Sequence, residues 1–228
     1  TQNYKSRLIT TDGVFSMDGY IAKLNEICDL ADKYNAIIHV DDSHATGFIG
    51  PHGKGSPDAH GVLDRVDIIT STFGKALGGA SGGFTSSSNE IISILRQKSR
   101  PYLFSNSLAP SIVYTSIRAL ELIEKDLSLK TTLKSNTEYF RKNIMKLGFD
   151  IKQGQHPIVP IMIYDAKIAN QIASEMLKKG VYVIAFSYPV VPKGQARIRV
   201  QISADHTLNQ LNEAIKAFQY CAEKYQII

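Results

Sequence analysis

The chain has 228 residues, of which 43% are hydrophobic and 21% are charged, and its formal net charge is +5 at pH 7. This length and composition predict a globular protein with one large or two small domains, and no apolar run approaches the ~20 residues that a membrane span needs. Lysine and arginine are scattered rather than clustered, so the charge does not indicate a nucleic-acid binder. Cys28 and Cys221 lack metal-ligand spacing, so we expect reduced structural thiols and no metal site.

The first third of the chain alternates apolar runs with a helical pattern. Residues 7–11 predict a strand, residues 20–33 carry apolar side chains at helical spacing, and residues 36–40 predict a second strand. Because a strand, a helix and a strand follow one another, the two strands should be parallel. A third buried strand is expected over residues 66–70, and His39 is expected to be a packed core residue.

Two of these strands lead into side chains that could act together. The strand at 36–40 is followed by Asp41 and His44, and the strand at 66–70 is followed by Lys75. Ligands of open α/β sheets lie at the carboxyl ends of the strands, so the three groups can converge. Pyridoxal phosphate chemistry needs this trio: a lysine holds the aldehyde as a Schiff base, a carboxylate pairs with the pyridinium nitrogen, and a third donor lies near the ring oxygen. Singly, each residue is better explained as a solvated side chain, a helix cap or a metal ligand; together and in this order, they favour the cofactor.

The segment after His44 is a loop rich in glycine and proline, residues 47–57. It lacks the Gly-Lys-Ser/Thr ending of a P-loop, so we interpret it as a loop near the active site. A strand at 82–85 and a helix at 89–98 follow, and residues 100–110 read as a loop before a long helix that begins at Pro110.

The domain boundary is expected within this long helix, which gives domains of residues 1–115 and 116–228. The second domain should be a smaller α+β domain. Its expected elements are a helix at 127–147, a strand at 158–163, a helix at 166–179, a strand at 181–186, a strand at 196–202 and a helix at 207–224.

Four segments together resemble one enzyme family. They are residues 11–19 (TDGVFSMDG), 41–47 (DDSHATG), 71–75 (STFGK) and 196–199 (ARIR). They resemble the α-oxoamine synthases, which are pyridoxal-phosphate enzymes of aminotransferase fold type I, and the resemblance runs collinearly along nearly the whole chain. It implies an α/β fold: part of a large cofactor-binding domain with a mainly parallel sheet in residues 1–115, and the small domain after it.

The resemblance also implies the roles of the candidate site residues. Lys75, Asp41 and His44 would be catalytic, with Asp41 against the pyridine nitrogen and His44 near the ring oxygen. The other implied cofactor contacts are Ser16 beside the ring, Thr72 at the phosphate, and Ser105 and Asn106 at the phosphate of a neighbouring subunit. A site shared in this way implies a homodimer.

Two arginines compete for the role of substrate carboxylate binder. Arg197 and Arg199 alternate along one strand and therefore lie on the same face. A bidentate guanidinium suits a carboxylate, but position on the strand does not choose between them. The resemblance assigns the role to Arg199 and leaves Arg197 as a surface ion-pair partner.

The reaction that the resemblance implies joins glycine to the acetyl group of acetyl-CoA, giving 2-amino-3-oxobutyrate and coenzyme A, or runs in reverse in threonine degradation to glycine. Family branches that make 8-amino-7-oxononanoate or 5-aminolevulinate remain alternatives. Family members also have an amino-terminal portion that precedes the segments matched here, so an inactive, truncated module is a further alternative. We expect no nucleic-acid or membrane partner, and both bacterial cytoplasm and mitochondrial matrix fit.

Overall fold

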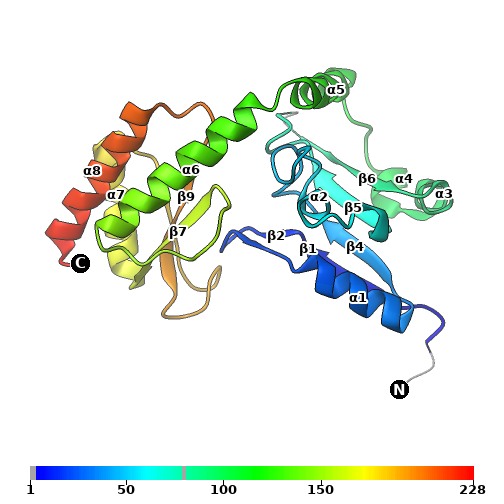
Figure 1. Ribbon diagram of the computed structural model, residues 1–228, viewed down its shortest axis with the longest axis horizontal. Coiled ribbons are helices and arrows are strands. Elements are labelled where there is room, and N and C mark those ends of the chain that lie inside the picture. The colour runs from blue at the N-terminus through cyan, green and yellow to red at the C-terminus, as the bar shows by residue number, and fades with distance from the viewer. Residues whose placement is uncertain (1–3, 79–80) are drawn as a thin grey trace. The chain divides into compact units, whose positions relative to one another are not determined.

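A computed structural model describes residues 4–78 and 81–228 of the chain, which form two compact units (Figure 1). Unit 1 comprises Thr1–Phe15 and Ile21–Leu127, and unit 2 comprises Ser16–Tyr20 and Ser128–Ile228. Gly79, at the end of the glycine-containing stretch after Lys75, lies outside the described residues. No helix in the described ranges is both long and apolar enough to cross a membrane.

Unit 1 is built on a four-stranded mixed sheet in the order β1-β4-β5-β6. The strands are β1 (Leu8–Asp12), β4 (Ile37–Asp41), β5 (Ile68–Thr72) and β6 (Gly83–Ser87). β1, β4 and β5 are parallel, which confirms the expected strand–helix–strand unit, and β6 returns antiparallel to β5. β4 and β5 each extend to the residues that the sequence placed just after the strand, so Asp41 and Thr72 are the last residues of their strands.

One face of this sheet is covered by helix α1 (Leu24–Tyr34). The helix buries Leu24, Cys28 and Ala31, whose spacing puts them on one side, against Ile38 and Val40 of β4. Because side chains alternate along a strand, His39 and Asp41 of β4 point to the opposite face of the sheet. This arrangement fixes the direction of Asp41, which follows Val40.

The opposite face carries His39, which is not the packed core residue that the sequence suggested. Its ring is half-buried and bridges three strands, with Nδ1 2.8 Å from the Thr10 hydroxyl and Nε2 3.0 Å from the Thr70 hydroxyl. Threonine partners on both neighbouring strands thus satisfy an imidazole that an apolar core would leave unpaired.

The rest of unit 1 is mainly helical. It contains α2 (Ser56–His60), the short 3₁₀ helix η1 (Leu63–Arg65), α3 (Asn89–Lys98), α4 (Arg100–Phe104) and α5 (Pro110–Lys125). The segment expected as a loop before α5 therefore begins with one helical turn, α4, which accepts Pro101 because a proline is tolerated in a first turn.

The boundary between the units falls after α5, between Leu127 and Ser128, whereas the sequence placed it between residues 115 and 116 inside that helix. Leu120 and Ile123, near the end of α5, line a cavity of about 300 Å³ together with Gly47 and Phe84. Because the carboxyl-terminal half of α5 packs on unit 1 in this way, the whole helix belongs to that unit.

Unit 2 has an antiparallel sheet in the order β7-β9-β8 and three long helices. Its elements are α6 (Ser128–Lys146), β7 (Ile158–Tyr164), α7 (Ala166–Lys178), β8 (Ile184–Phe186), β9 (Ala196–Gln201) and α8 (Leu208–Tyr225). These match the expected elements closely and confirm an α+β unit. The core holds six consecutive buried residues of β7 and the Phe140, Phe149 and Phe218 ring cluster.

A β-hairpin that the sequence did not indicate connects β1 to α1. Its strands are β2 (Val14–Phe15) and β3 (Tyr20–Ile21), and the residues between and including Ser16 and Tyr20, called the hairpin tip below, belong to unit 2. Gly19 adopts φ +69° in this tip, a left-handed conformation that favours glycine.

Candidate active site

Four of the candidate residues gather at one edge of the sheet of unit 1. Asp41 ends β4 and Thr72 ends β5, and these neighbouring parallel strands are in register with Asp41 opposite Thr70. His44 and Lys75 follow three residues after each strand end. The structure thus brings Asp41, His44, Thr72 and Lys75 to the carboxyl-terminal edge where ligands of α/β sheets bind.

The acid of this group is held by the turn that follows it. The half-buried carboxylate of Asp41 accepts a hydrogen bond of 3.0 Å from the backbone nitrogen of Ser43 through Oδ1. The carbonyl of Asp42 accepts from the backbone nitrogens of Ala45 and Thr46, at 2.9 and 3.0 Å, and thereby closes the turn that carries His44. The relative positions of Asp41 and His44 therefore depend on the backbone of Asp42.

The side chain of Asp42 is an anchor that the sequence analysis did not single out. Its carboxylate is completely buried and accepts from Ser56 twice, from the backbone nitrogen at 2.9 Å and from the hydroxyl at 2.5 Å. Burial raises the pKa of Asp42 to about 6, which the bonds from Ser56 partly counteract. Gly13 and Gly55 flank this carboxylate so closely that a Cβ at either position would collide with it.

Lys75 lies in the loop after β5, and its side chain is exposed. Across residues 4–78 and 81–228, the Lys75 amine has no hydrogen-bond or ion-pair partner. The loop itself is anchored, because Leu77 is buried and the Thr72 hydroxyl donates to the carbonyl of Gly82 at 3.1 Å while accepting from the nitrogen of Gly74 at 3.1 Å. The amine is therefore available for chemistry on an anchored loop.

Ser71 connects the two strand ends. Its buried hydroxyl donates to the hydroxyl of Thr46 at 2.8 Å and thus ties β5 to the turn that carries His44. In the sequence, Ser71 stands out only as part of the motif at residues 71–75. Because side chains alternate along a strand, Ser71 and Thr72 point to opposite faces, and this was the signal that could have identified the buried link.

Ser105 and Asn106 are not joined to these four residues by any hydrogen bond within the described part of the chain. Both are exposed and lie in the segment between α4 and α5, where Ser105 has an extended backbone. Their expected role, at the phosphate of a neighbouring subunit, would not require contact with the site of their own chain.

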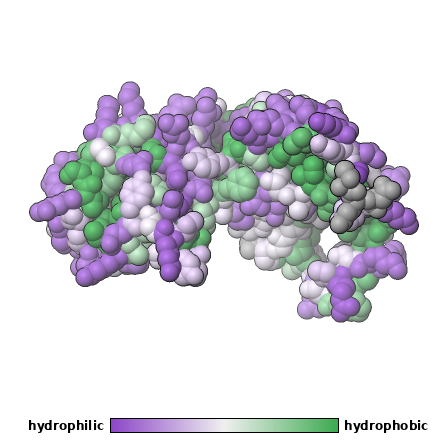
Figure 2. All heavy atoms as spheres, turned by 90° about the horizontal axis from the view of Figure 1, so that it is seen from below, coloured by the Kyte–Doolittle hydropathy of each residue, from purple (hydrophilic) through white to green (hydrophobic). Residues whose placement is uncertain are grey.

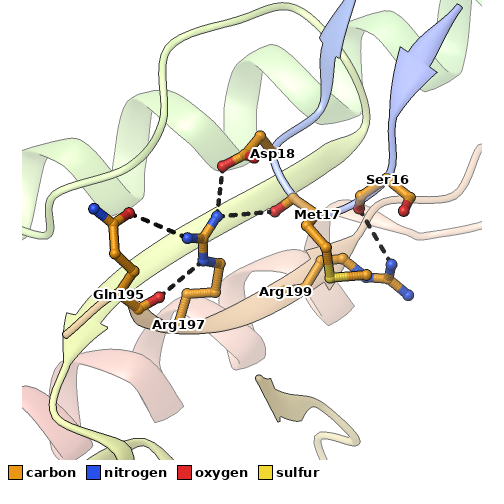
Figure 3. Close-up of polar contacts among 6 residues, drawn as sticks. All are labelled: Ser16, Met17, Asp18, Gln195, Arg197 and Arg199. Carbon is orange, nitrogen blue, oxygen red and sulfur yellow. Dashed lines mark hydrogen bonds and ion pairs between the residues drawn. The ribbon is translucent and has the colours of Figure 1, made fainter. Parts of the chain in front are cut away.

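Ser16 and Arg199 lie in unit 2 (Figure 3). Nη1 of Arg199 donates to the carbonyl of Ser16 at 3.2 Å, and the guanidinium lies 4.9 Å from the centre of the Phe186 ring. The side chain of Arg199 is half-buried, and this burial lowers its pKa from the ordinary arginine value. No ion pair of Arg199 is recorded in the described ranges, which suits a binder of an external carboxylate.

Arg197 differs sharply from Arg199, although the two side chains share a face of β9. Only 2% of Arg197 is exposed, so the expectation of a surface residue is wrong, although the ion pair itself is present. Nη1 of Arg197 lies 2.5 Å from Oδ1 of Asp18 and 3.3 Å from the carbonyl of Met17, and Nε donates to the carbonyl of Gln195 at 3.0 Å. The two arginines, which strand position does not distinguish, therefore differ in burial and in hydrogen-bond partners.

No group of three or more histidine, cysteine, aspartate or glutamate residues that could hold a metal ion occurs in the part of the chain that the structure describes. Cys28 and Cys221 are both buried and form no disulfide, Cys28 in the core of unit 1 and Cys221 in that of unit 2.

Known proteins resemble the chain over nearly all of its length. It is 54% identical over 221 residues to the 2-amino-3-ketobutyrate coenzyme A ligase of Escherichia coli (strain K12), a match that covers 97% of this chain and 56% of that protein. The mitochondrial 2-amino-3-ketobutyrate coenzyme A ligase of Homo sapiens is 51% identical, with 95% of this chain and 52% of that protein covered. The 8-amino-7-oxononanoate synthase of Thermosipho melanesiensis is 43% identical, with 98% and 57% covered. The chain thus spans about half the length of the curated relatives that it matches.

Solved structures agree with the fold. A serine palmitoyltransferase from S. paucimobilis with a bound PLP–myriocin aldimine superimposes with a TM-score of 0.93 at 31% identity, and the match covers 98% of this chain and 56% of that chain. The expected α/β fold of the aminotransferase type is therefore confirmed. The family model for aminotransferase class I and II matches residues 1–218, and the chain belongs to this family.

Proposed function

We propose that this chain carries the cofactor-binding and glycine-binding residues of a pyridoxal-phosphate-dependent acyltransferase, which interconverts glycine and acetyl-CoA with 2-amino-3-oxobutyrate and coenzyme A. The observation that carries the proposal is the amine of Lys75, which has no partner in residues 4–78 and 81–228 and follows the strand next to the one that ends at Asp41. The choice of substrates is supported by the identity of 54% to the E. coli ligase, against 43% to the oxononanoate synthase.

The residues of unit 1 fit pyridoxal phosphate. One oxygen of Asp41 is bound by Ser43, and the other has no hydrogen-bond partner in the described ranges, so it can accept from a protonated ring nitrogen. His44 lies on the same turn and can donate near the ring oxygen. When bound, the cofactor supplies an electron sink that stabilises negative charge on the α-carbon of an amino acid.

Each residue then has a definite task. Lys75 would hold the cofactor through its amine, and the same amine would take a proton from the α-carbon of glycine. Asp41 would pair with the ring nitrogen and favour its protonated form. Arg199 holds the glycine carboxylate through paired N–H donors, which fixes the orientation of the α-carbon.

Further residues would contact the phosphate of the cofactor. We assign it the Thr72 hydroxyl and, from the neighbouring subunit, Ser105 and Asn106, while Ser16 lies beside the ring. Thr72 already donates to the carbonyl of Gly82, so its contact with phosphate requires the hydroxyl hydrogen to leave that carbonyl. The Thr72 hydroxyl can still accept the hydrogen bond from the backbone nitrogen of Gly74.

The acyl transfer forms a bond from the glycine α-carbon to the acetyl carbonyl carbon and breaks the thioester C–S bond, so that coenzyme A leaves as its thiol after taking up a proton. In the opposite direction the same residues cleave 2-amino-3-oxobutyrate, which yields glycine in threonine catabolism. The human relative is named as mitochondrial, and bacterial cytoplasm and mitochondrial matrix are both retained as proposed compartments.

A homodimer is part of the proposal, because Ser105 and Asn106 would serve the partner's site. The elements on either side of them expose large aromatic side chains, with Tyr102 63%, Phe104 77% and Tyr114 67% exposed. On the face drawn in Figure 2, hydrophobic residues are exposed between hydrophilic ones. A second copy that covers α4 and the start of α5 would remove these rings from water, which favours association.

The first test adds pyridoxal phosphate to the chain, reduces with borohydride and locates the modified peptide by mass spectrometry. We expect modification at Lys75 and its loss in Lys75→Arg, with Lys193→Arg as a control because Lys193 is an exposed lysine of unit 2. Modification spread evenly over surface lysines would contradict the cofactor assignment. The substrate assignment is tested separately with glycine and either acetyl-CoA or a longer acyl-CoA; preference for the longer donor would favour an oxononanoate-type reaction.

A further inference from the structure

We propose that Arg197 is a positioning residue that sequesters the carboxylate of Asp18 and so leaves Arg199 free to bind the carboxylate of a substrate. This inference rests on the proposed role of Arg199. It explains why one strand carries two arginines on one face, of which only Arg197 lies in an ion pair within the described part of the chain.

The two arginines contact the same short segment. Figure 3 shows Arg197 reaching Asp18 and the carbonyl of Met17, and Arg199 reaching the carbonyl of Ser16. Asp18 thus lies two residues from the backbone group that Arg199 already contacts. A carboxylate in this place is the natural counter-ion for whichever guanidinium reaches it.

The hairpin tip is held in place from its other side, so its carbonyls do not depend on Arg197 alone. A Cβ on Gly19 would come within 2.8 Å of the carbonyl of Ile158, which shows how closely the tip packs on the start of β7. Buried Arg141 of α6 holds that region by donating to the carbonyls of His156 and Ile158, at 3.0 and 2.9 Å. The tip can therefore keep its place when the ion pair is altered.

The energetic consequence follows from charge. Asp18 is 31% exposed in its side chain, so it can rotate, whereas Arg197 is buried and keeps it engaged with additional support from Gln195. If Arg197 loses its charge, the freed carboxylate of Asp18 can pair with Arg199. It would then compete directly with the substrate carboxylate for one guanidinium.

The test compares three variants with the wild-type chain, each with cofactor bound. Arg197→Gln should raise KM for glycine about tenfold with kcat within about threefold, because uniform binding of the carboxylate is what is lost. Arg197→Lys retains a cation for Asp18 and should stay near wild type. The double variant Asp18→Asn with Arg197→Gln should recover most of the lost glycine affinity, because asparagine cannot neutralise Arg199.

A second readout needs no turnover. The rate at which phenylglyoxal modifies Arg199, followed by peptide mass spectrometry without cofactor, should fall in Arg197→Gln and return in the double variant. Asp205→Asn, an exposed position in unit 2, is the control and should change neither measurement.

The outcomes separate the two proposals. A double variant as impaired as Arg197→Gln in both measurements would mean that Arg197 acts only through packing, and the sequestration proposal fails. If the modification rates follow the expected pattern while neither these variants nor Arg199→Lys alter KM for glycine, sequestration stands and the assignment of Arg199 as carboxylate binder fails.

Discussion

Ser56 donates two hydrogen bonds to the buried carboxylate of Asp42, the immediate neighbour of Asp41. This contact spans the whole glycine-rich loop after His44 and joins the end of β4 to the start of α2. Ser56→Ala removes the hydroxyl donor and keeps the backbone donor. Since a hydrogen bond to a charged group contributes about 1.5–3 kcal/mol, we expect the free energy of unfolding to fall by about 2 kcal/mol.

Denaturant unfolding of Ser56→Ala measures this loss, and Ser174→Ala is the matched control. Ser174 is exposed on α7, where its hydroxyl donates only to a carbonyl one turn earlier, that of Asn170. An equal loss in both variants would show that the hydroxyl contact with Asp42 contributes no more to the free energy of unfolding than the exposed hydroxyl contact of Ser174.

The pKa of Asp42 predicts an unusual dependence of stability on pH. Its ordinary value is 3.8 and burial raises it to about 6 in the folded chain. Between these values the folded state keeps a proton that the unfolded state has lost, so the contribution of protonated Asp42 is complete below pH 3.8 and is lost as pH rises through about 6. The difference between these two pKa values corresponds to about 3 kcal/mol.

Asp42→Asn removes this titration. The wild-type free energy of unfolding minus that of the variant, measured from pH 4 to pH 7, should therefore fall by about 3 kcal/mol as pH rises. A flat difference curve would show that Asp42 does not change its charge over this range. Using the difference cancels the other carboxylates, which titrate in both proteins.

The positions of the strand ends were predictable, but their support was not. Asp41 and Lys75 follow apolar runs that periodicity identifies, and the rule for parallel sheets then places them at one edge. The partner of Asp42 lies 14 residues away in a loop without periodicity, and local pattern carries no signal for such a contact. The hairpin of β2 and β3 was also missed, because strands of only two residues each are too short to show a periodic pattern.

Arg197 and Arg199 show a second limit. Alternation correctly put both on one face of β9, yet their different burial depends on Asp18, which lies 179 residues from Arg197. Only the folded chain reveals that pairing. Ser16 and Asp18 lie in one motif, residues 11–19, but nothing in the sequence separates the carbonyl that contacts Arg199 from the carboxylate that contacts Arg197.

Gly13 should tolerate no side chain, for a steric reason alone. A Cβ there would collide with the Asp42 carboxylate and the Ser56 hydroxyl. Overpacking typically costs about 1–3 kcal/mol, so Gly13→Ala should lower the unfolding free energy by about that amount and reduce cofactor labelling at Lys75.

The control for Gly13→Ala is Gly61→Asn, because no atom lies within 4 Å of a Cβ at Gly61 and asparagine tolerates its φ of +65°. Its stability should change by less than about 1 kcal/mol. If Gly13→Ala is equally mild, the carboxylate can move aside and the anchor is less rigid than its contacts indicate.

Arg141 should contribute strongly to the stability of unit 2. It is 6% exposed and its guanidinium donates to the carbonyls of Lys152, His156 and Ile158, at 2.9, 3.0 and 2.9 Å, while burial lowers its pKa. Lysine cannot place donors on all three carbonyls, and a buried acceptor left unpaired costs about 1–3 kcal/mol. Arg141→Lys should therefore lower the unfolding free energy by at least about 2 kcal/mol.

The control is Arg118→Lys, at an exposed ion pair with Glu121 on α5, which should change the unfolding free energy by less than about 0.5 kcal/mol. Thermal and denaturant unfolding of both variants decide the matter, and equal effects would mean that the loop before β7 does not depend on Arg141.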